Sequence, residues 1–274
     1  MNFDNIYIKA LKHVLDNGVE QLNGRTKAKI LATHGYSFDY DMNILPLLYV
    51  RKVWAKSAAA ELAWFLSGTR DATWVNEQTS IWKEFTDEND EIPTAYGYRW
   101  SRAFGYDQID NIITKLKEDP TSRQQVLLSW DPRVDNREVA LNIPCPLMYI
   151  INIIDNKLNI HLTLRSNDVW LGLPYDVMTA CLLGKALANT LKVDLGKLHY
   201  SIAHMHLYEN QLEAAGAAIG ISKTFKKTSF PLVRNFSSYT IYGIRKHKDA
   251  YVESFNHLKD YNFSGWKPKV NVVR

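Results

Sequence analysis

The chain has 274 residues, of which 46% are hydrophobic and 23% are charged, and its formal net charge is +4. This composition is typical of a globular protein with a sizeable core and excludes a disordered or fibrous chain. The weak positive charge favours an ordinary solvated surface, with a phosphate-binding cleft as the alternative.

No linker rich in Pro, Gly or Ser, low-complexity tract or internal repeat divides the sequence, so we expect one domain over residues 1–274. Two cysteines, Cys145 and Cys181, are too few for a disulfide framework. The sequence shows no signal-peptide pattern and no apolar run near the roughly 20 residues that span a bilayer. We therefore expect a cytoplasmic protein with no membrane partner.

Periodicity in the first quarter of the chain predicts two helices and a strand. Apolar side chains recur on one side of residues 3–17, which predicts an amphipathic helix. A turn at 23–26 precedes a strand near 29–33. Residues 53–67 predict a second helix, which Gly68 ends.

The middle of the chain predicts a β-hairpin over residues 147–164, with turn residues at 155–157. Cys145 would enter its first strand and Arg165 would leave its second, so strand pairing would bring these two side chains together. Residues 176–192 then predict a buried helix. Strands and helices without a regular βαβ alternation indicate an α+β fold.

The most informative stretch covers residues 165–176 and reads Arg-Ser-Asn-Asp-Val-Trp-Leu-Gly-Leu-Pro-Tyr-Asp. It places a fixed cation, a hydroxyl, a tight Gly-Leu-Pro turn and a carboxylate close together. That combination suits an anionic small molecule with a polar ring better than it suits a core.

The stretch resembles the thymidylate synthase family, whose pattern is Arg-Ser-x-Asp-x-x-Leu-Gly-Leu-Pro-Phe-Asn after Pro-Cys-His. Residues 60–68 are similar to the family's Glu-Leu-x-Trp-Phe-Leu-x-Gly, and the resemblance extends from residue 25 to about 210. It implies a single catalytic domain with the α+β thymidylate synthase fold. In that fold a mixed sheet packs with helices and lies at the interface of a homodimer.

The resemblance implies that Cys145 is the nucleophile that adds to C6 of a pyrimidine, helped by nearby cations such as Arg165. Glu61 would transfer protons, because a carboxyl among apolar residues is costly unless it lies in a cleft. Tyr96 would lie near the thiol. Without the motif, Cys145 would be interpreted as a small buried hydrophobe and Glu61 as a solvent-facing helix edge. Cys181 is interpreted as structural.

A deoxypyrimidine monophosphate is the implied substrate. Its implied ligands are Arg25, Arg123, Arg165, Ser166, Asn167, Asp176, His206 and Tyr208. The arginines would hold phosphate, although each alone could be a surface ion-pair partner. In the family, the ligands equivalent to Arg123 come from the second subunit, which implies a homodimer. Gln124 departs from the family's usual second arginine.

The implied co-substrate is 5,10-methylenetetrahydrofolate. Its implied contacts are Trp82, Phe85, Asp168, Leu171, Gly172 and Tyr175. Aromatic side chains can pack on a pterin ring, although a single Trp could equally belong to the core. The tail at 266–274 could close over the site. No residues have metal-ligand spacing, so we expect no metal.

Asp176 stands where thymidylate synthases have asparagine. An asparagine amide matches the N3–H and O4 of uracil, whereas a protonated carboxyl matches the N3 and 4-amino group of cytosine. Bacteriophage deoxycytidylate hydroxymethylases resemble this chain at Asn167 and Asp176, and Pro146 also departs from the synthases. The alternative is that Asp176 only caps a helix.

The sequence thus predicts one-carbon transfer to C5 of dCMP, giving 5-hydroxymethyl-dCMP and tetrahydrofolate. One alternative is a dCMP methyltransferase that gives 5-methyl-dCMP and dihydrofolate, and another is an enzyme that uses dUMP. A non-catalytic nucleotide- or RNA-binding dimer is a further alternative, but it would need neither Cys145 nor Glu61. The resemblance requires no nucleic-acid partner. If a phage encodes the chain, the expected location is the cytoplasm of the host.

Overall fold

The computed structural model describes residues 2–136, 142–223, 238–261, 263–266, 268 and 270. Its centre is a six-stranded sheet in the order β1-β2-β6-β5-β4-β3. The strands are β1 (Val19–Leu22), β2 (Lys29–Asp41), β3 (Val126–Leu128), β4 (Pro146–Ile154), β5 (Lys157–Asp168) and β6 (Asp194–Tyr208). Neighbours are antiparallel except for β5 and β6, which are parallel. The sheet is therefore mixed, which confirms the α+β prediction.

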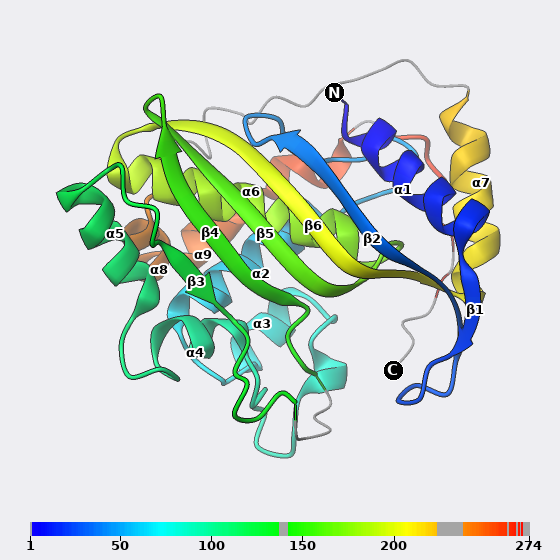
Figure 1. The fold of residues 1–274 in the computed structure, drawn as a ribbon, viewed down its shortest axis with the longest axis horizontal. Coiled ribbons are helices and arrows are strands. Elements are labelled where there is room, and N and C mark those ends of the chain that lie inside the picture. The colour runs from blue at the N-terminus through cyan, green and yellow to red at the C-terminus, as the bar shows by residue number, and fades with distance from the viewer. Residues whose placement is uncertain are drawn as a thin grey trace.

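Helices pack on one face of this sheet (Figure 1). They are α1 (Phe3–Asn17), α2 (Ala55–Ser67), α3 (Thr73–Gln78), α4 (Tyr96–Ser101), α5 (Gln108–Glu118), α6 (Gly172–Leu191), α7 (Leu212–Ser222), α8 (Ile241–Lys246) and α9 (Lys248–Glu253). Short 3₁₀ turns cover Lys83–Phe85, Glu209–Gln211 and Asn256–Asp260. Helix α6 contacts β5 and β6, and α2 lies against α6. Helices α1 and α7 lie side by side near the β1 end of the sheet.

The hairpin of β4 and β5 confirms the predicted pairing. Asp155 and Asn156 have φ of 52° and 55°, so they form a two-residue turn of the kind that favours Asn and Asp. Lys157 already belongs to β5, one residue earlier than predicted. The Arg165 amide donates to the Cys145 carbonyl at 3.0 Å, so the two ends of the hairpin meet as expected.

Two helix predictions hold closely. Helix α1 covers the predicted residues, and the Asn2 side chain caps it by accepting from the Asp4 amide at 3.0 Å. Helix α2 begins at Ala55 rather than at residue 53, and Gly68 ends it with a left-handed φ of 67°. The strand predicted near 29–33 continues to Asp41.

Helix α6 begins at Gly172, four residues earlier than predicted. Proline is tolerated in a first helical turn because its missing N–H has no partner there, so Pro174 does not delay the start. The N-cap is Leu171 and no side chain caps the helix, so the alternative of Asp176 as a helix cap is wrong. Helix α6 joins β5 to β6 in a parallel β-α-β crossover that the periodicity did not indicate.

In the described part of the chain, no helix combines the length and apolarity needed to cross a membrane. Cys181 lies in α6 and is fully buried, in agreement with a structural role.

We predict that Gly97→Ala destabilises the fold. A Cβ at Gly97 would lie 2.0 Å from the Phe65 carbonyl oxygen, because α4 contacts α2 through its backbone. Overpacking of this kind costs about 1–3 kcal/mol or more, measurable by urea unfolding. The control is Gly216→Ala in α7, where no atom would lie within 4 Å of the added Cβ. Helix propensity predicts a gain of about 0.5–1 kcal/mol for that control, and equal effects of the two substitutions would contradict the packing argument.

Candidate functional site

A cavity of about 490 Å³ collects nearly every predicted site residue. It is lined by Arg25, Glu61, Trp82, Phe85, Tyr96, Cys145, Arg165, Ser166, Asn167, Asp168, Leu171, Gly172, Tyr175, Asp176, His206 and Tyr208. These residues come from β5, β6, α2, α4, the first turns of α6 and the loops around them. Arg123 is exposed and does not line this cavity.

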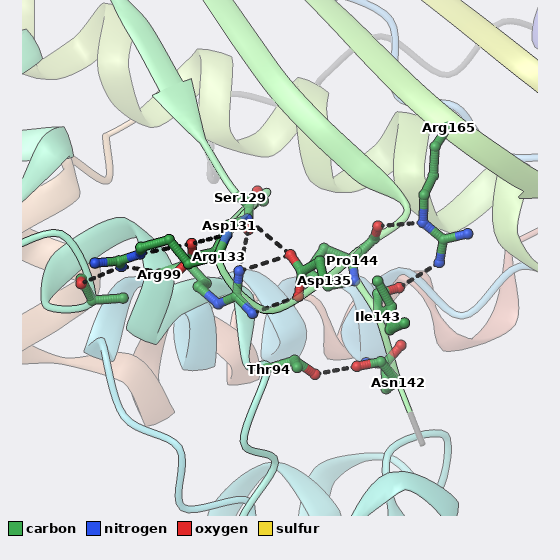
Figure 2. A network of polar contacts seen from close by, with 11 residues as sticks. Thr94, Arg99, Ser129, Asp131, Arg133, Asp135, Asn142, Ile143, Pro144 and Arg165 are labelled. Atoms are coloured by element: carbon green, nitrogen blue, oxygen red, sulfur yellow. Dashed lines mark hydrogen bonds and ion pairs between the residues drawn. The ribbon is translucent and has the colours of Figure 1, made fainter. Parts of the chain in front are cut away.

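Arg165 holds the segment that carries Cys145 (Figure 2). Its Nε donates to the Pro144 carbonyl at 2.8 Å and its Nη2 donates to the Ile143 carbonyl at 2.7 Å. The same Nη2 lies 3.7 Å from the Cys145 Sγ. One guanidinium therefore anchors the backbone before the cysteine and places a positive charge beside the thiol.

A buried ion pair fixes the neighbouring loop (Figure 2). Arg99 on α4 donates to both carboxylate oxygens of Asp135 at 2.9 and 2.8 Å. Asp135 also accepts from the Asp131 amide at 2.8 Å, and Arg99 donates to the Ser129 carbonyl at 3.2 Å. Because the pair is bidentate and further hydrogen-bonded, it ties α4, which begins at Tyr96, to the residues that follow β3.

The Cys145 thiol is half-buried, and burial raises its pKa above the ordinary value. The positive charge of Arg165 lowers this pKa, and Arg25 does so more weakly. A negative charge on Asp176 raises it. The thiolate, which is the nucleophilic form, is therefore favoured when Asp176 is neutral.

Glu61 is 7% exposed, and Trp82 Nε1 donates to its Oε1 at 2.8 Å. Burial and the neighbouring charge of Asp176 raise the pKa of Glu61 to about 8, against the opposing effect of the Trp82 hydrogen bond. The solvent-facing interpretation is therefore wrong. A carboxyl that titrates near neutrality inside a cavity is suited to proton transfer.

Asp176 faces the same cavity one helical turn after Gly172. Burial raises the pKa of Asp176 to about 7, although hydrogen bonds from Tyr200 and Asn167 lower it. The Asp176 carboxyl therefore has its proton-bound and ionised forms both accessible near neutral pH. A neutral carboxyl can donate a hydrogen bond, which an ionised one cannot.

Polar side chains expected to hold the phosphate and sugar also line the cavity, with the exception of Arg123. The Asn23 side chain accepts from the amides of Arg25 and Thr26 at 3.0 and 3.1 Å, which shapes the turn that carries Arg25. Ser166 Oγ lies 3.4 Å from His206 Nδ1. Burial lowers the pKa of His206 to about 4, so the imidazole is neutral and can share a hydrogen bond with a hydroxyl.

The cavity lining also includes aromatic side chains, which can pack on a flat, partly polar ring. Trp82 and Phe85 lie edge to face with ring centroids 6.0 Å apart, and Tyr175 also lines the cavity. Asp168 accepts from the Leu171 amide and from the Gln211 side chain, both at 2.9 Å, so its carboxyl is held in one orientation. An aromatic wall with a fixed carboxyl suits a pterin, which offers both a flat face and N–H donors.

A profile of the family described as thymidylate synthase matches residues 5–265. The chain belongs to the thymidylate synthase family. It is 31% identical over 267 residues to a thymidylate synthase of Francisella tularensis subsp. holarctica strain FTNF002-00 / FTA, and equally to that of strain OSU18. These alignments cover 92% of this chain and 95% of each relative.

A solved structure, thermostable thymidylate synthase A from Bacillus subtilis, has the same fold, with a TM-score of 0.74 at 24% identity. The match covers 89% of this chain and 94% of the other. Family membership makes the protein an enzyme that transfers a one-carbon unit to a nucleotide with methylenetetrahydrofolate as co-substrate. The Francisella relatives and the Bacillus structure all bear the name thymidylate synthase, and none of them is a deoxycytidylate hydroxymethylase, so the expected likeness to that enzyme at Asn167 and Asp176 stays a prediction.

Several cavity residues were missed by the sequence analysis. Tyr149 and Thr179 line the cavity but occupy core positions of β4 and α6. Asn23 lines it too, and its place before the Gly24-Arg25 turn was an available signal. Among the described residues, no cluster of three His, Cys, Asp or Glu side chains could hold a metal ion.

The predicted closure of the tail stays a prediction. Trp266 packs edge to face on Trp170, with ring centroids 6.2 Å apart. Lys267, Lys269 and residues 271–274 lie outside the described residues.

We predict that Glu61→Gln stabilises the ligand-free protein increasingly as pH rises. The pKa of Glu61 is about 8 in the folded protein against an ordinary value of 4.5, so the folded protein keeps a proton that the unfolded chain has released. Stability is therefore lost between about pH 4.5 and pH 8. The variant avoids this loss and should gain up to about 5 kcal/mol above pH 8 in urea unfolding, since each unit of pKa difference corresponds to about 1.4 kcal/mol.

The control for this experiment is Glu213→Gln on the exposed surface of α7, which should show no pH-dependent gain. A Glu61→Gln curve that parallels the parent protein at every pH would show that Glu61 ionises freely in the fold.

Proposed function

We propose that the protein transfers a one-carbon unit to C5 of dCMP, giving 5-hydroxymethyl-dCMP and tetrahydrofolate. The observation that carries the choice of base is the Asp176 carboxyl, which lines the cavity and whose pKa is about 7. Cytosine offers an acceptor at N3, and a proton between that atom and the carboxyl completes the hydrogen bond. Uracil offers N3–H and O4, which match an amide instead.

Cys145 acts as the nucleophile in this proposal. The Cys145 thiolate adds to C6 of the pyrimidine, forming a carbon–sulfur bond and placing electron density on C5. Arg165 beside Sγ supports the thiolate, and a neutral Asp176 does not oppose it. A proton held between Asp176 and N3 also draws electron density from C6 and so helps the addition.

Methylenetetrahydrofolate supplies the carbon at the oxidation level of formaldehyde. C5 attacks this methylene carbon, and its bond to one folate nitrogen breaks as that nitrogen takes up a proton. C5 then loses its proton, the remaining carbon–nitrogen bond breaks, and tetrahydrofolate leaves. Water adds to the exocyclic methylene that remains and provides the hydroxyl of the product. Glu61 is placed to accept and return protons, because it lines the cavity and its pKa is about 8. Release of Cys145 from C6 then restores the aromatic ring.

A second candidate is methyl transfer, in which hydride from the folate replaces water and dihydrofolate is formed. The relatives favour methyl transfer, since they bear the name thymidylate synthase. They also favour a uracil nucleotide as the substrate. Dihydrofolate absorbance separates the two reactions, because hydroxymethylation gives none. Keeping both Cys145 and Glu61 in the cavity speaks against a non-catalytic nucleotide- or RNA-binding dimer.

We predict that the protein turns over dCMP in preference to dUMP and that Asp176→Asn reverses this preference. An amide at position 176 leaves a buried polar mismatch with cytosine, which costs about 1–3 kcal/mol per unpaired group. The ratio of kcat/KM for dCMP to that for dUMP should fall on the order of 100-fold. The measurement is release of tritium from C5 of each labelled nucleotide.

The matched control is Asp16→Asn on the exposed side of α1, which should leave the ratio unchanged. Preferential turnover of dUMP by the parent protein would overturn the choice of base.

We propose a homodimer in which the partner supplies Arg123. Arg123 and Gln124 are exposed and lie outside this chain's own cavity, just before β3 at the sheet edge. Val126, the first residue of β3, is 40% exposed although apolar. The sheet face opposite α6 is largely free of described helices, which leaves room for a second copy (Figure 1).

We predict that two inactive variants restore activity when mixed. Cys145→Ser removes the nucleophile, and Arg123→Ala removes the phosphate ligand given to the partner. A mixed dimer then has one site with both groups intact, so random exchange of equal amounts should recover about a quarter of the parent activity. Each variant alone should show little turnover, and no recovery on mixing would contradict the shared site.

A further inference from the structure

We propose that Asn167 and Tyr200 are positioning residues that fix which oxygen of Asp176 meets the base. The inference rests on the proposed function, because it concerns how the same carboxyl recognises cytosine. Asn167 Nδ2 donates to Asp176 Oδ2 at 2.7 Å, and the Tyr200 hydroxyl donates to the same oxygen at 3.3 Å. Tyr200 does not line the cavity, so it acts only through the carboxyl.

The three side chains form a closed triangle in which every donor has a defined direction. The second hydrogen of Asn167 Nδ2 goes to the Tyr200 hydroxyl oxygen at 3.2 Å. Burial and the charge of Asp176 hold the pKa of Tyr200 well above its ordinary range, so Tyr200 keeps its proton and donates it. An inverted Asn167 amide would turn an oxygen toward Asp176 Oδ2, so the triangle also fixes the amide.

Burial makes this arrangement stable. Asn167 is 2% exposed and Tyr200 is fully buried, so water does not compete for either donor. The Tyr200 ring also stacks on Phe38, with centroids 5.1 Å apart, which holds the phenol in place.

Gly172 leaves the space that the triangle needs. A Cβ at Gly172 would lie 3.3 Å from Asn167 Nδ2 and 3.4 Å from Asp176 Oδ2. The first distance is tighter than most real Cβ contacts, and the second is at the limit of an ordinary van der Waals contact. The glycine of the Gly-Leu-Pro motif therefore allows the end of β5 to approach the first turns of α6.

The consequence concerns the location of one proton. Asn167 and Tyr200 both donate to Asp176 Oδ2, and no described residue donates to Oδ1. A proton bound by the carboxyl is therefore held on Oδ1, on the side left for the ligand. That proton lies between Oδ1 and N3 of cytosine, whichever of the two carries it. A uracil N3–H would meet the same proton as donor against donor.

The test measures Kd for dCMP and for dUMP between pH 5 and pH 9, in proteins that also carry Cys145→Ser so that the thiol does not titrate. At pH 5, where Asp176 is protonated in both proteins, Tyr200→Phe should weaken dCMP binding about 10-fold and leave dUMP binding nearly unchanged, because the carboxyl loses one of the two donors that orient it. Asn167→Ala should have a larger effect in the same sense.

The pH dependence supplies a second readout. Tyr200 and Asn167 both lower the pKa of Asp176, so either substitution raises that pKa. The pH at which dCMP binding is lost on raising the pH should therefore move upward from about 7. The groups facing Asp176 that also titrate or carry charge are Glu61, Tyr96, Tyr149, Asp168 and Tyr200. All but the one substituted stay the same across the series, in which Cys145→Ser has removed the thiol.

The matched control is Tyr40→Phe. Tyr40 is a buried tyrosine on β2 whose hydroxyl has no partner among the described residues, so losing that hydroxyl should change neither nucleotide preference nor pH dependence. If Tyr200→Phe changes neither the preference for dCMP nor the pH midpoint of binding, the positioning role is overturned. The proposed function is not contradicted by that result. Tighter binding of dUMP than dCMP by Cys145→Ser alone would instead overturn the proposed function.

Discussion

The burial of two carboxyl groups in one cavity governs what this site can do. Glu61 and Asp176 both lose solvent there, and burial raises the pKa of Glu61 to about 8 and that of Asp176 to about 7 because ionisation without water is costly. The charge of Asp176 further raises the pKa of Glu61, so the two titrations are linked. In the proposed function, one neutral carboxyl donates to a base while the other moves protons.

The fold supplies this environment through one short stretch of chain. Strand β5 places Arg165 beside Cys145 through its pairing with β4, and then delivers Asn167 to the cavity. The crossover from β5 into α6 brings Asp176 back over Asn167 within one helical turn of Gly172. Parallel pairing of β5 with β6 sets His206 beside Ser166. In the proposed function, Cys145, Asp176 and His206 are thus all placed through their contacts with β5.

The sequence predicted the parts of the site that depend on local order. The alternation in the hairpin was enough to bring Cys145 to Arg165, and the family pattern assigned the residues that line the cavity. Tyr200 could not be found in this way, because it occupies a core position of β6 and its hydroxyl meets Asp176 only after the crossover forms. The early start of α6 was missed for a local reason, since Pro174 was interpreted as lying before the helix rather than in its first turn. The role of Arg123 could not be predicted in full either, because a single chain does not show whether Arg123 binds ligand in its own cavity or in that of a partner.

The most direct test is a crystal structure of the Cys145→Ser protein with dCMP bound. The account predicts that Asp176 Oδ1 lies at hydrogen-bond distance from N3 of the base, about 2.7–3.0 Å, while Oδ2 stays with Asn167 and Tyr200. A carboxyl turned away from the ring, with the base held by other groups, would contradict it.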